Sequence, residues 1–178
     1  MYDDVTALIL AGGKATRMGG VDKRELVVGG QTIFERQLAA LAGVAEVLVS
    51  SKRDIPGVRT VRDAVVNGGP LAGIAAGLAV ARTPWVFVLA GDMPYVTAGL
   101  VARMLDARGD GDAVGIRIGE LPEPLVCVLK VATYAPLVDA RLARGDLKAS
   151  RLLTDGRVTW LADVDRLLVR NVNAPDDL

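Results

Sequence analysis

The strongest constraint on the fold of this chain is the alternation of short, largely apolar runs with segments of helical pattern. The runs at residues 5–10, 44–50 and 85–90 contain many β-branched residues, as is typical of strands buried inside a parallel sheet. Helical patterns separate and follow them. This alternation predicts an α/β domain with a mostly parallel sheet.

Capping motifs and hydrophobic patterns also predict the remaining helices and strands. Thr32 and Glu35 have the spacing of a capping box, so a helix is expected to begin after Thr32 and to end near Gly43. No linker precedes the last third, which is therefore expected to extend the same sheet, making residues 1–178 one domain. Further strands are expected at residues 58–62, 113–118, 125–131, 158–161 and 167–169, and further helices at 71–81, 97–107, 133–143 and 147–153.

Composition excludes several kinds of chemistry. The chain has no histidine and only one cysteine, so imidazole bases, Ser-His-Asp triads, disulfides and cysteine-cluster metal sites are all ruled out. A bound metal would have to be a hard cation held by oxygen atoms, and Mg²⁺ is the expected one. The 21 basic and 21 acidic residues balance, which argues against nucleic-acid binding. No run reaches the length of a membrane span, and the acidic N-terminus is unlike a secretory signal, so a cytoplasmic location is expected.

The first group of candidate functional residues follows the strand predicted at residues 5–10. Residues 10–23 read LAGGKATRMGGVDK, with four glycines and the cations Lys14, Arg17 and Lys23. Glycines allow the backbone to turn sharply, and its exposed N–H groups can then surround an anion. The spacing is neither that of a P-loop nor that of the dinucleotide-binding fingerprint. A phosphate-binding loop is favoured, and a loop with solvated charges is the alternative.

Further candidates follow other strands. Asp92 comes directly after the apolar run at 85–90 and precedes Pro94, so its carboxylate is expected at the crevice that the first loop faces. It could hold Mg²⁺, or it could simply cap a helix. Asp63 ends another strand and could bind a ligand or be an ordinary strand-end residue. Residues 67–73, NGGPLAG, place a glycine turn before a helix whose free N–H groups could face a ligand, although close packing would explain the small residues equally well.

These motifs together resemble the molybdenum cofactor guanylyltransferase family, within the nucleotidyltransferases of Rossmann-like α/β/α fold. The resemblance rests on residues 10–23, Asp63, residues 69–73, residues 91–94, Pro124-Leu125 and the terminal NVNAPDDL. It implies that residues up to about 100 bind the nucleotide and that the C-terminal part binds the acceptor. Ser50 stands where the family often has asparagine. The implied nucleotide-binding residues are Leu10, Ala11, Gly12, Gly13, Lys23, Ser50, Asp63, Gly69, Pro70, Leu71 and Asp92; the catalytic residues are Arg17, Lys23 and Asp92; and the Mg²⁺ ligands are Asp92 and Asn173, with Asn171 as the alternative to Asn173.

The implied reaction transfers GMP from GTP to the terminal phosphate of molybdopterin and releases pyrophosphate. The nucleophile is already anionic near neutral pH, so a protein without histidine could catalyse it. Two alternatives remain open: another nucleotidyltransferase, such as a molybdopterin cytidylyltransferase, and a non-catalytic nucleotide-binding partner in cofactor assembly. The expected partners are GTP, molybdopterin and transient cofactor-assembly proteins, with no nucleic acid or membrane, and the chain is expected to be a monomer or weak oligomer.

Overall fold

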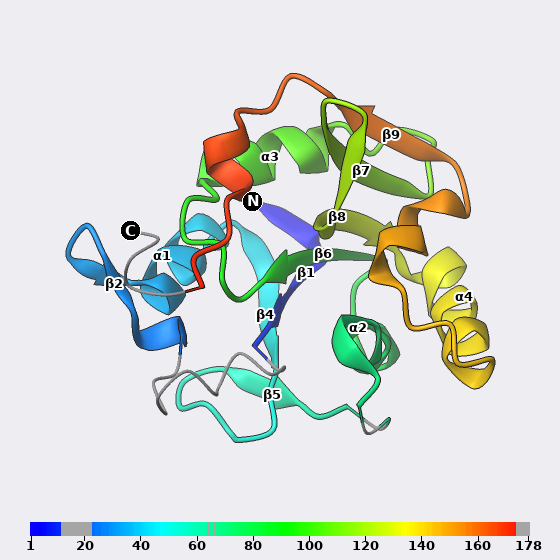
Figure 1. The fold of residues 1–178 in the computed structure, drawn as a ribbon, viewed down its shortest axis with the longest axis horizontal. Coiled ribbons are helices and arrows are strands. Elements are labelled where there is room, and N and C mark those ends of the chain that lie inside the picture. Colours follow the sequence, from blue (N-terminus) through cyan, green and yellow to red (C-terminus); the bar gives the residue numbers. More distant parts are fainter. Residues whose placement is uncertain (12–22, 64, 66, 174–178) are drawn as a thin grey trace.

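A computed structural model describes residues 1–11, 23–63, 65 and 67–173. Its centre is a seven-stranded sheet in the order β5-β4-β1-β6-β8-β7-β9 (Figure 1). Only β8 runs antiparallel to its neighbours, so the sheet is mostly parallel. Its strands are β1 (Tyr2–Leu10), β4 (Val44–Ser50), β5 (Arg59–Val61), β6 (Trp85–Ala90), β7 (Ala113–Ile118), β8 (Leu121–Lys130) and β9 (Val158–Leu161); a separate hairpin pairs β2 (Val27–Val28) with β3 (Gln31–Thr32).

Helices cover both faces of the sheet, which gives the three layers seen in Figure 1. Helices α1 (Ile33–Ala40) and α3 (Ala98–Asp106) pack on one face, and α2 (Gly69–Val80) and α4 (Val131–Ala143) on the other. Alternate residues of β1 serve the two cores: Ile9 belongs to the first and Leu8 to the second, and both are fully buried. The predicted α/β fold is therefore confirmed. In the described residues, no helix has the length and apolar character that a bilayer span requires.

Several predicted bounds match the structure closely. Strands β4, β6, β7 and β9 have the expected limits. The capping box at the start of α1 is also present: the Glu35 backbone N–H donates to Thr32 Oγ1 at 3.1 Å, and the Thr32 N–H donates to Glu35 Oε2 at 2.8 Å. These bonds satisfy two N–H groups that the helix cannot pair internally.

Other predictions were wrong or incomplete. The strand expected at 167–169 is the 3₁₀ helix η4 (Arg166–Val169), which the Asp165 side chain caps through the Leu167 N–H. The helix expected at 147–153 is the 3₁₀ helix η3 (Ala149–Thr154), and the sequence analysis missed the short η2 (Lys23–Glu25) and the β2–β3 hairpin. Hairpin and 3₁₀ segments of this length are too short for hydrophobic periodicity to identify them.

The order of strands changes direction between β1 and β6. The chain passes from β1 outward to β4 and β5, and then returns to place β6 on the other side of β1. Beyond the paired ends, the Gly91 N–H donates to Leu10 O at 3.0 Å. A Cβ on Gly91 would lie 2.8 Å from that oxygen and 3.3 Å from Ala11 Cα. Only glycine, which has no Cβ, allows the two backbones to approach this closely. In open α/β sheets, ligands bind in the crevice at the carboxyl ends of the strands where the strand order reverses, and this contact lies at that position.

Replacing Gly91 with alanine is expected to force these two backbones apart. Because the obstacle is backbone rather than a side chain that could rotate, the free energy of unfolding should fall by about 1–3 kcal/mol. Urea denaturation would measure it. Gly43→Ala is the matched control, because a Cβ at Gly43 meets nothing within 4 Å. Equal effects of the two substitutions would contradict the role assigned to Gly91.

Candidate functional site

The first wall of the site is formed where β1 and β4 end. Ala11 donates its N–H to Ser50 O at 2.9 Å, so the first loop leaves the sheet beside Ser50. The Ser50 side chain is 2% exposed and donates from Oγ to Asp63 Oδ1 at 2.8 Å. Asp63 itself is exposed. Ser50 thus fixes the orientation of the Asp63 carboxylate, leaving its other oxygen for a ligand.

Helix α2 begins next to this wall. Gly69 has a φ of +62°, a conformation that favours glycine, and no side chain caps the helix at Gly68. Gly69 and Pro70 are exposed, so they remain candidates for ligand contact, whereas the Leu71 side chain is fully buried in the core. Of Leu71, only the backbone could reach a nucleotide.

The second wall is the turn that follows β6. Asp92 lies in this turn, between the buried residues Gly91 and Met93, and its own side chain is half-buried. Its backbone oxygen accepts the Val172 N–H at 2.7 Å. Val172 is fully buried and packs with Val28 and Ile33. The C-terminal segment is thereby attached to the Asp92 turn.

Val172 also places the two asparagines that flank it. Asn171 lines a cavity, while Asn173 accepts a hydrogen bond at Oδ1 from the Lys23 ammonium at 2.8 Å. This bond joins residues 150 positions apart. It brings Lys23 from the end of the first loop close enough to Asp92 to influence its ionisation. The structure thus places Lys23, Asn173 and the Asp92 turn beside one another, and the roles that the sequence assigns to these residues stay predictions.

Burial raises the pKa of the Asp92 carboxyl above its ordinary value, because a charged carboxylate loses solvation there. The Lys23 charge and a hydrogen bond from the Asp92 backbone oppose this shift only in part. A partly desolvated carboxylate next to one cation is suited to bind a further cation.

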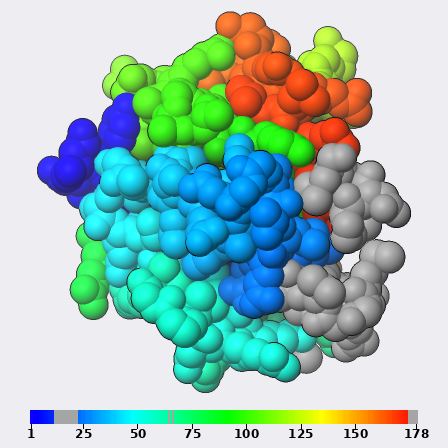
Figure 2. Space-filling model, turned by 90° about the vertical axis from the view of Figure 1, so that its left-hand side faces the viewer, coloured from blue at the N-terminus to red at the C-terminus, as the bar shows by residue number. Residues whose placement is uncertain are grey.

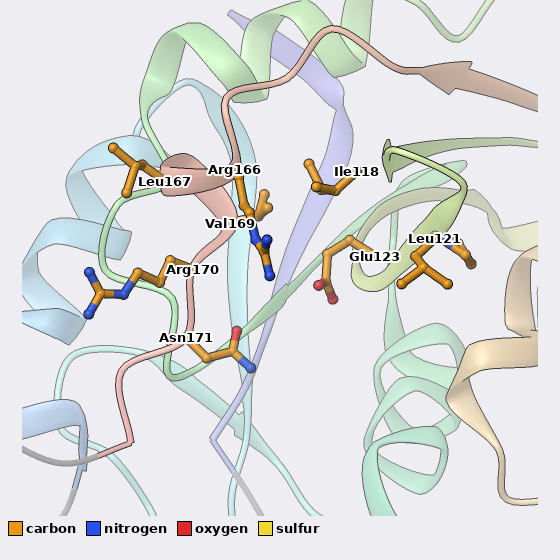
Figure 3. A pocket seen from close by; sticks show the side chains of 9 residues that line it. Ile118, Leu121, Glu123, Arg166, Leu167, Val169, Arg170 and Asn171 are labelled. Atoms are coloured by element: carbon orange, nitrogen blue, oxygen red, sulfur yellow. The ribbon is translucent and has the colours of Figure 1, made fainter. Parts of the chain in front are cut away.

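A cavity of about 830 Å³ opens between the β7–β8 turn and the segment 166–171. Figure 3 shows Arg166, Glu123 and Asn171 pointing into the same space, whereas Arg170 points away. Burial is the main cause that raises the pKa of Glu123, and the negative charge of Asp92 raises it further, against a hydrogen bond from the Leu125 N–H. The cavity adjoins the Asp92 turn, because its lining residue Asn171 directly precedes Val172, whose N–H donates to Asp92 O.

The residues at the Asp92 turn suit a divalent cation that is coordinated by only one or two protein side chains. Among the described residues, no group of three carboxylate, cysteine or histidine side chains gathers to form a complete cage. Mg²⁺ does not need one, since it commonly takes one or two carboxylates and completes its shell with water and substrate phosphates. Asp92 fits this pattern. The Asn173 oxygen is engaged by Lys23, and its role as a metal ligand stays a prediction.

Not every candidate can be placed. Gly12, Gly13 and Arg17 lie outside the described residues. Conversely, sequence reasoning missed Glu123 and Arg166, which enter the cavity from β8 and η4. Their only sequence pattern was a charge beside apolar residues, which is also typical of a solvated surface.

Comparison with known proteins decides the family. A family model described as the MobA-like NTP transferase domain matches residues 7–160. The chain belongs to this family. The molybdenum cofactor guanylyltransferase of Cupriavidus necator is 31% identical over 190 residues, covering 99% of this chain and 95% of that protein. The enzyme of the same name from Serratia proteamaculans is 35% identical over 155 residues, covering 83% of this chain and 78% of that protein.

Solved structures of related fold agree with the MobA-like assignment. The molybdopterin-guanine dinucleotide biosynthesis protein A of Archaeoglobus fulgidus superposes with a TM-score of 0.75 at 21% identity, covering 97% of this chain and 94% of that chain. The 2-C-methyl-D-erythritol 4-phosphate cytidylyltransferase of Thermus thermophilus gives a TM-score of 0.69 at 22% identity, covering 96% and 93%. The resemblance inferred from the motifs is confirmed, and these structures establish the nucleotidyltransferase fold.

Asp92→Asn is expected to stabilise the protein at neutral pH when a chelator removes divalent cations. A raised folded-state pKa means that the folded state holds its proton more tightly, so stability falls as pH rises from the ordinary carboxyl pKa through the folded one. The amide escapes this loss. The advantage, measured by urea denaturation, should shrink as pH is lowered toward about 4.

Asp139→Asn, on the exposed surface of α4, is the matched control and should show no such pH-dependent gain. A variant at Asp92 that is less stable than wild type at pH 7 would contradict the expectation.

Proposed function

We propose that this chain transfers GMP from GTP to the terminal phosphate of molybdopterin, forming the guanine dinucleotide cofactor and releasing pyrophosphate. The observation that carries the proposal is that Lys23 and Asp92 are bonded to consecutive residues of the C-terminal segment, Lys23 to the Asn173 side chain and the Asp92 backbone to Val172, just beyond the end of β6. A cation and an acid at this point match the needs of a triphosphate and its counterion. Relatives named molybdenum cofactor guanylyltransferase, which align with nearly the whole chain, support the choice of nucleotide and acceptor.

The chemistry requires alignment more than a strong base. A phosphate monoester loses its second proton near pH 6, so the acceptor phosphate is largely anionic at neutral pH and can attack the α-phosphate directly. Lys23 would stabilise the charge that develops on the transferring and leaving phosphates. Its bond to Asn173 holds the ammonium in place without neutralising it, because the amide is uncharged.

Asp92 would hold Mg²⁺, and Asn173 could add an oxygen ligand. The ion supplies charge neutralisation to the phosphates when bound. Asp92 would otherwise orient this end of the site, since its backbone is attached to the C-terminal segment through Val172. Arg17, which the family resemblance places on the phosphates, would add a second cation from the first loop.

The base pocket would be formed by residues that surround the end of β4. The carboxylate of Asp63, oriented by Ser50, could accept hydrogen bonds from a nucleotide, and the exposed start of α2 offers backbone groups next to it. A cytidylyltransferase is the closest alternative, because that fold is shared and Ser50 lacks the amide of the family's usual asparagine. A nucleotide-binding module without catalytic activity is the second alternative function.

Pyrophosphate release should distinguish these functions. We expect release with GTP and molybdopterin plus Mg²⁺, and much less with CTP, ATP or UTP. Lys23→Ala should lower kcat/KM by about 100-fold, since it removes a charge directed at the phosphates. Lys148→Ala, an exposed lysine before η3, is the control.

Preference for CTP would favour the cytidylyltransferase. GTP binding without pyrophosphate release, in the presence of the acceptor, would favour the binding module.

The cavity beside the Asp92 turn supports an acceptor site in the C-terminal part of the chain. It is lined by apolar residues together with Arg166, Glu123 and Asn171, a mixture suited to a ring that carries polar edges and a phosphate. Arg166→Ala is expected to raise the KM for molybdopterin about 10-fold while leaving the KM for GTP unchanged. Arg144→Ala, whose side chain bonds only locally to Ala140 O, serves as the control. An equal rise in both KM values would place Arg166 elsewhere in the reaction.

A further inference from the structure

We infer that Gln37 is a positioning residue that sets the direction of Asp92. Gln37 lies on α1, is 1% exposed and reaches across to the turn after β6. Its Nε2 donates to Ala90 O at 2.8 Å and to Met93 O at 3.2 Å. These two carbonyls bracket Asp92 in sequence. One amide group therefore fastens the turn on both sides of the acid.

The position of this amide argues against an ordinary core role. Gln37 occupies the helical face that continues from Ile33 and Phe34 into the core, where an apolar side chain would be expected. Its own Oε1 is buried and has no hydrogen-bond partner in the part of the chain that the structure describes. Burying an unpaired amide oxygen costs stability. An amide retained at such a cost indicates a role that an apolar residue cannot supply.

Two further contacts complete the attachment of this turn. The neighbouring Arg36 donates from Nε to Pro94 O at 2.9 Å, and the Val172 N–H donates to the oxygen of Asp92 itself. In Figure 2 the blue-to-cyan surface of the α1 region meets the green segment that follows β6, and the red C-terminal segment lies above. The carbonyls at positions 90, 92, 93 and 94 are thus all held from outside the turn, so the backbone has little freedom to redirect the carboxylate.

The inference rests on the proposed function and deepens it. Groups that orient a ligand to a metal or phosphate commonly change activity 10–100-fold when removed, although they touch no substrate. Gln37 would act in this way through Asp92 alone. It would therefore affect kcat far more than the binding of GTP, whose other contacts lie along β1, β4 and α2.

Gln37→Met provides the test. Methionine has a similar size and removes the unpaired Oε1, but it takes the amide donor away from both Met93 O and Ala90 O, of which Ala90 O keeps the Met93 N–H at 3.4 Å. The urea midpoint should therefore fall only modestly. We expect kcat for pyrophosphate release from GTP and molybdopterin to fall about 10- to 100-fold, with the KM for GTP within about twofold of wild type. Gln31→Met, at an exposed position of β3, is the matched control and should retain full activity.

A double-mutant cycle with Asp92→Asn separates positioning from general damage. If Gln37 acts through Asp92, Gln37→Met should cause no further loss in the Asp92→Asn background. The same fold-loss in both backgrounds would overturn the inference, because it would show an effect independent of the acid.

Amide hydrogen exchange provides a readout that needs no turnover. In Gln37→Met the N–H groups of Gly91 and Met93 should exchange faster than in wild type, while those in the middle of β1 should not. Unchanged exchange in the turn would also overturn the inference. If wild-type protein releases no pyrophosphate with any nucleotide, the proposed function fails, and the exchange data still decide whether Gln37 holds the turn.

Discussion

The site depends on the parallel pairing of β1 with β6. These two strands are neighbours in space although 80 residues separate their paired positions, such as Val5 and Trp85. Their carboxyl ends stay joined just beyond the paired positions, where the Gly91 N–H donates to Leu10 O at 3.0 Å. Ser50, which bonds to Asp63, adjoins the end of β1, and Asp92 follows β6. A shift in this pairing would therefore displace these residues from one another.

The site holds the Asp92 carboxylate in a partly buried position, where its charged form is disfavoured. The Asp92 carboxyl is partly removed from water, and the charge of Lys23 favours its ionised form only in part. Gln37 adds a second unfavourable feature, a buried amide oxygen that has no hydrogen-bond partner among the described residues. An apolar residue would remove either cost, although at position 37 it would also take the amide donor away from Ala90 O and Met93 O. Such local violations of packing rules are characteristic of positions at which function and stability conflict.

One buried side chain, that of Val172, attaches the C-terminal segment to the turn that contains Asp92. Val172 packs with Val28 and Ile33, and its own N–H donates to Asp92 O. Asn171 and Asn173 then face different surroundings, the cavity and Lys23 respectively. Val172 thereby separates an asparagine that bonds to Lys23 from one that lines the cavity.

The sequence by itself determined the strands β4, β6, β7 and β9, the capping box of α1, the order of layers and the family, because each depends on local periodicity, capping or a contiguous motif. It also predicted that Lys23 and Asp92 lie at one edge of the sheet, since parallel strands share their carboxyl ends. Only the tertiary structure decided that η4 is not a strand, that Asn173 bonds to Lys23, and that Gln37, Glu123 and Arg166 face the site. These contacts join residues far apart in the chain. Their formation is set by how elements pack against one another, which no local pattern of residues encodes.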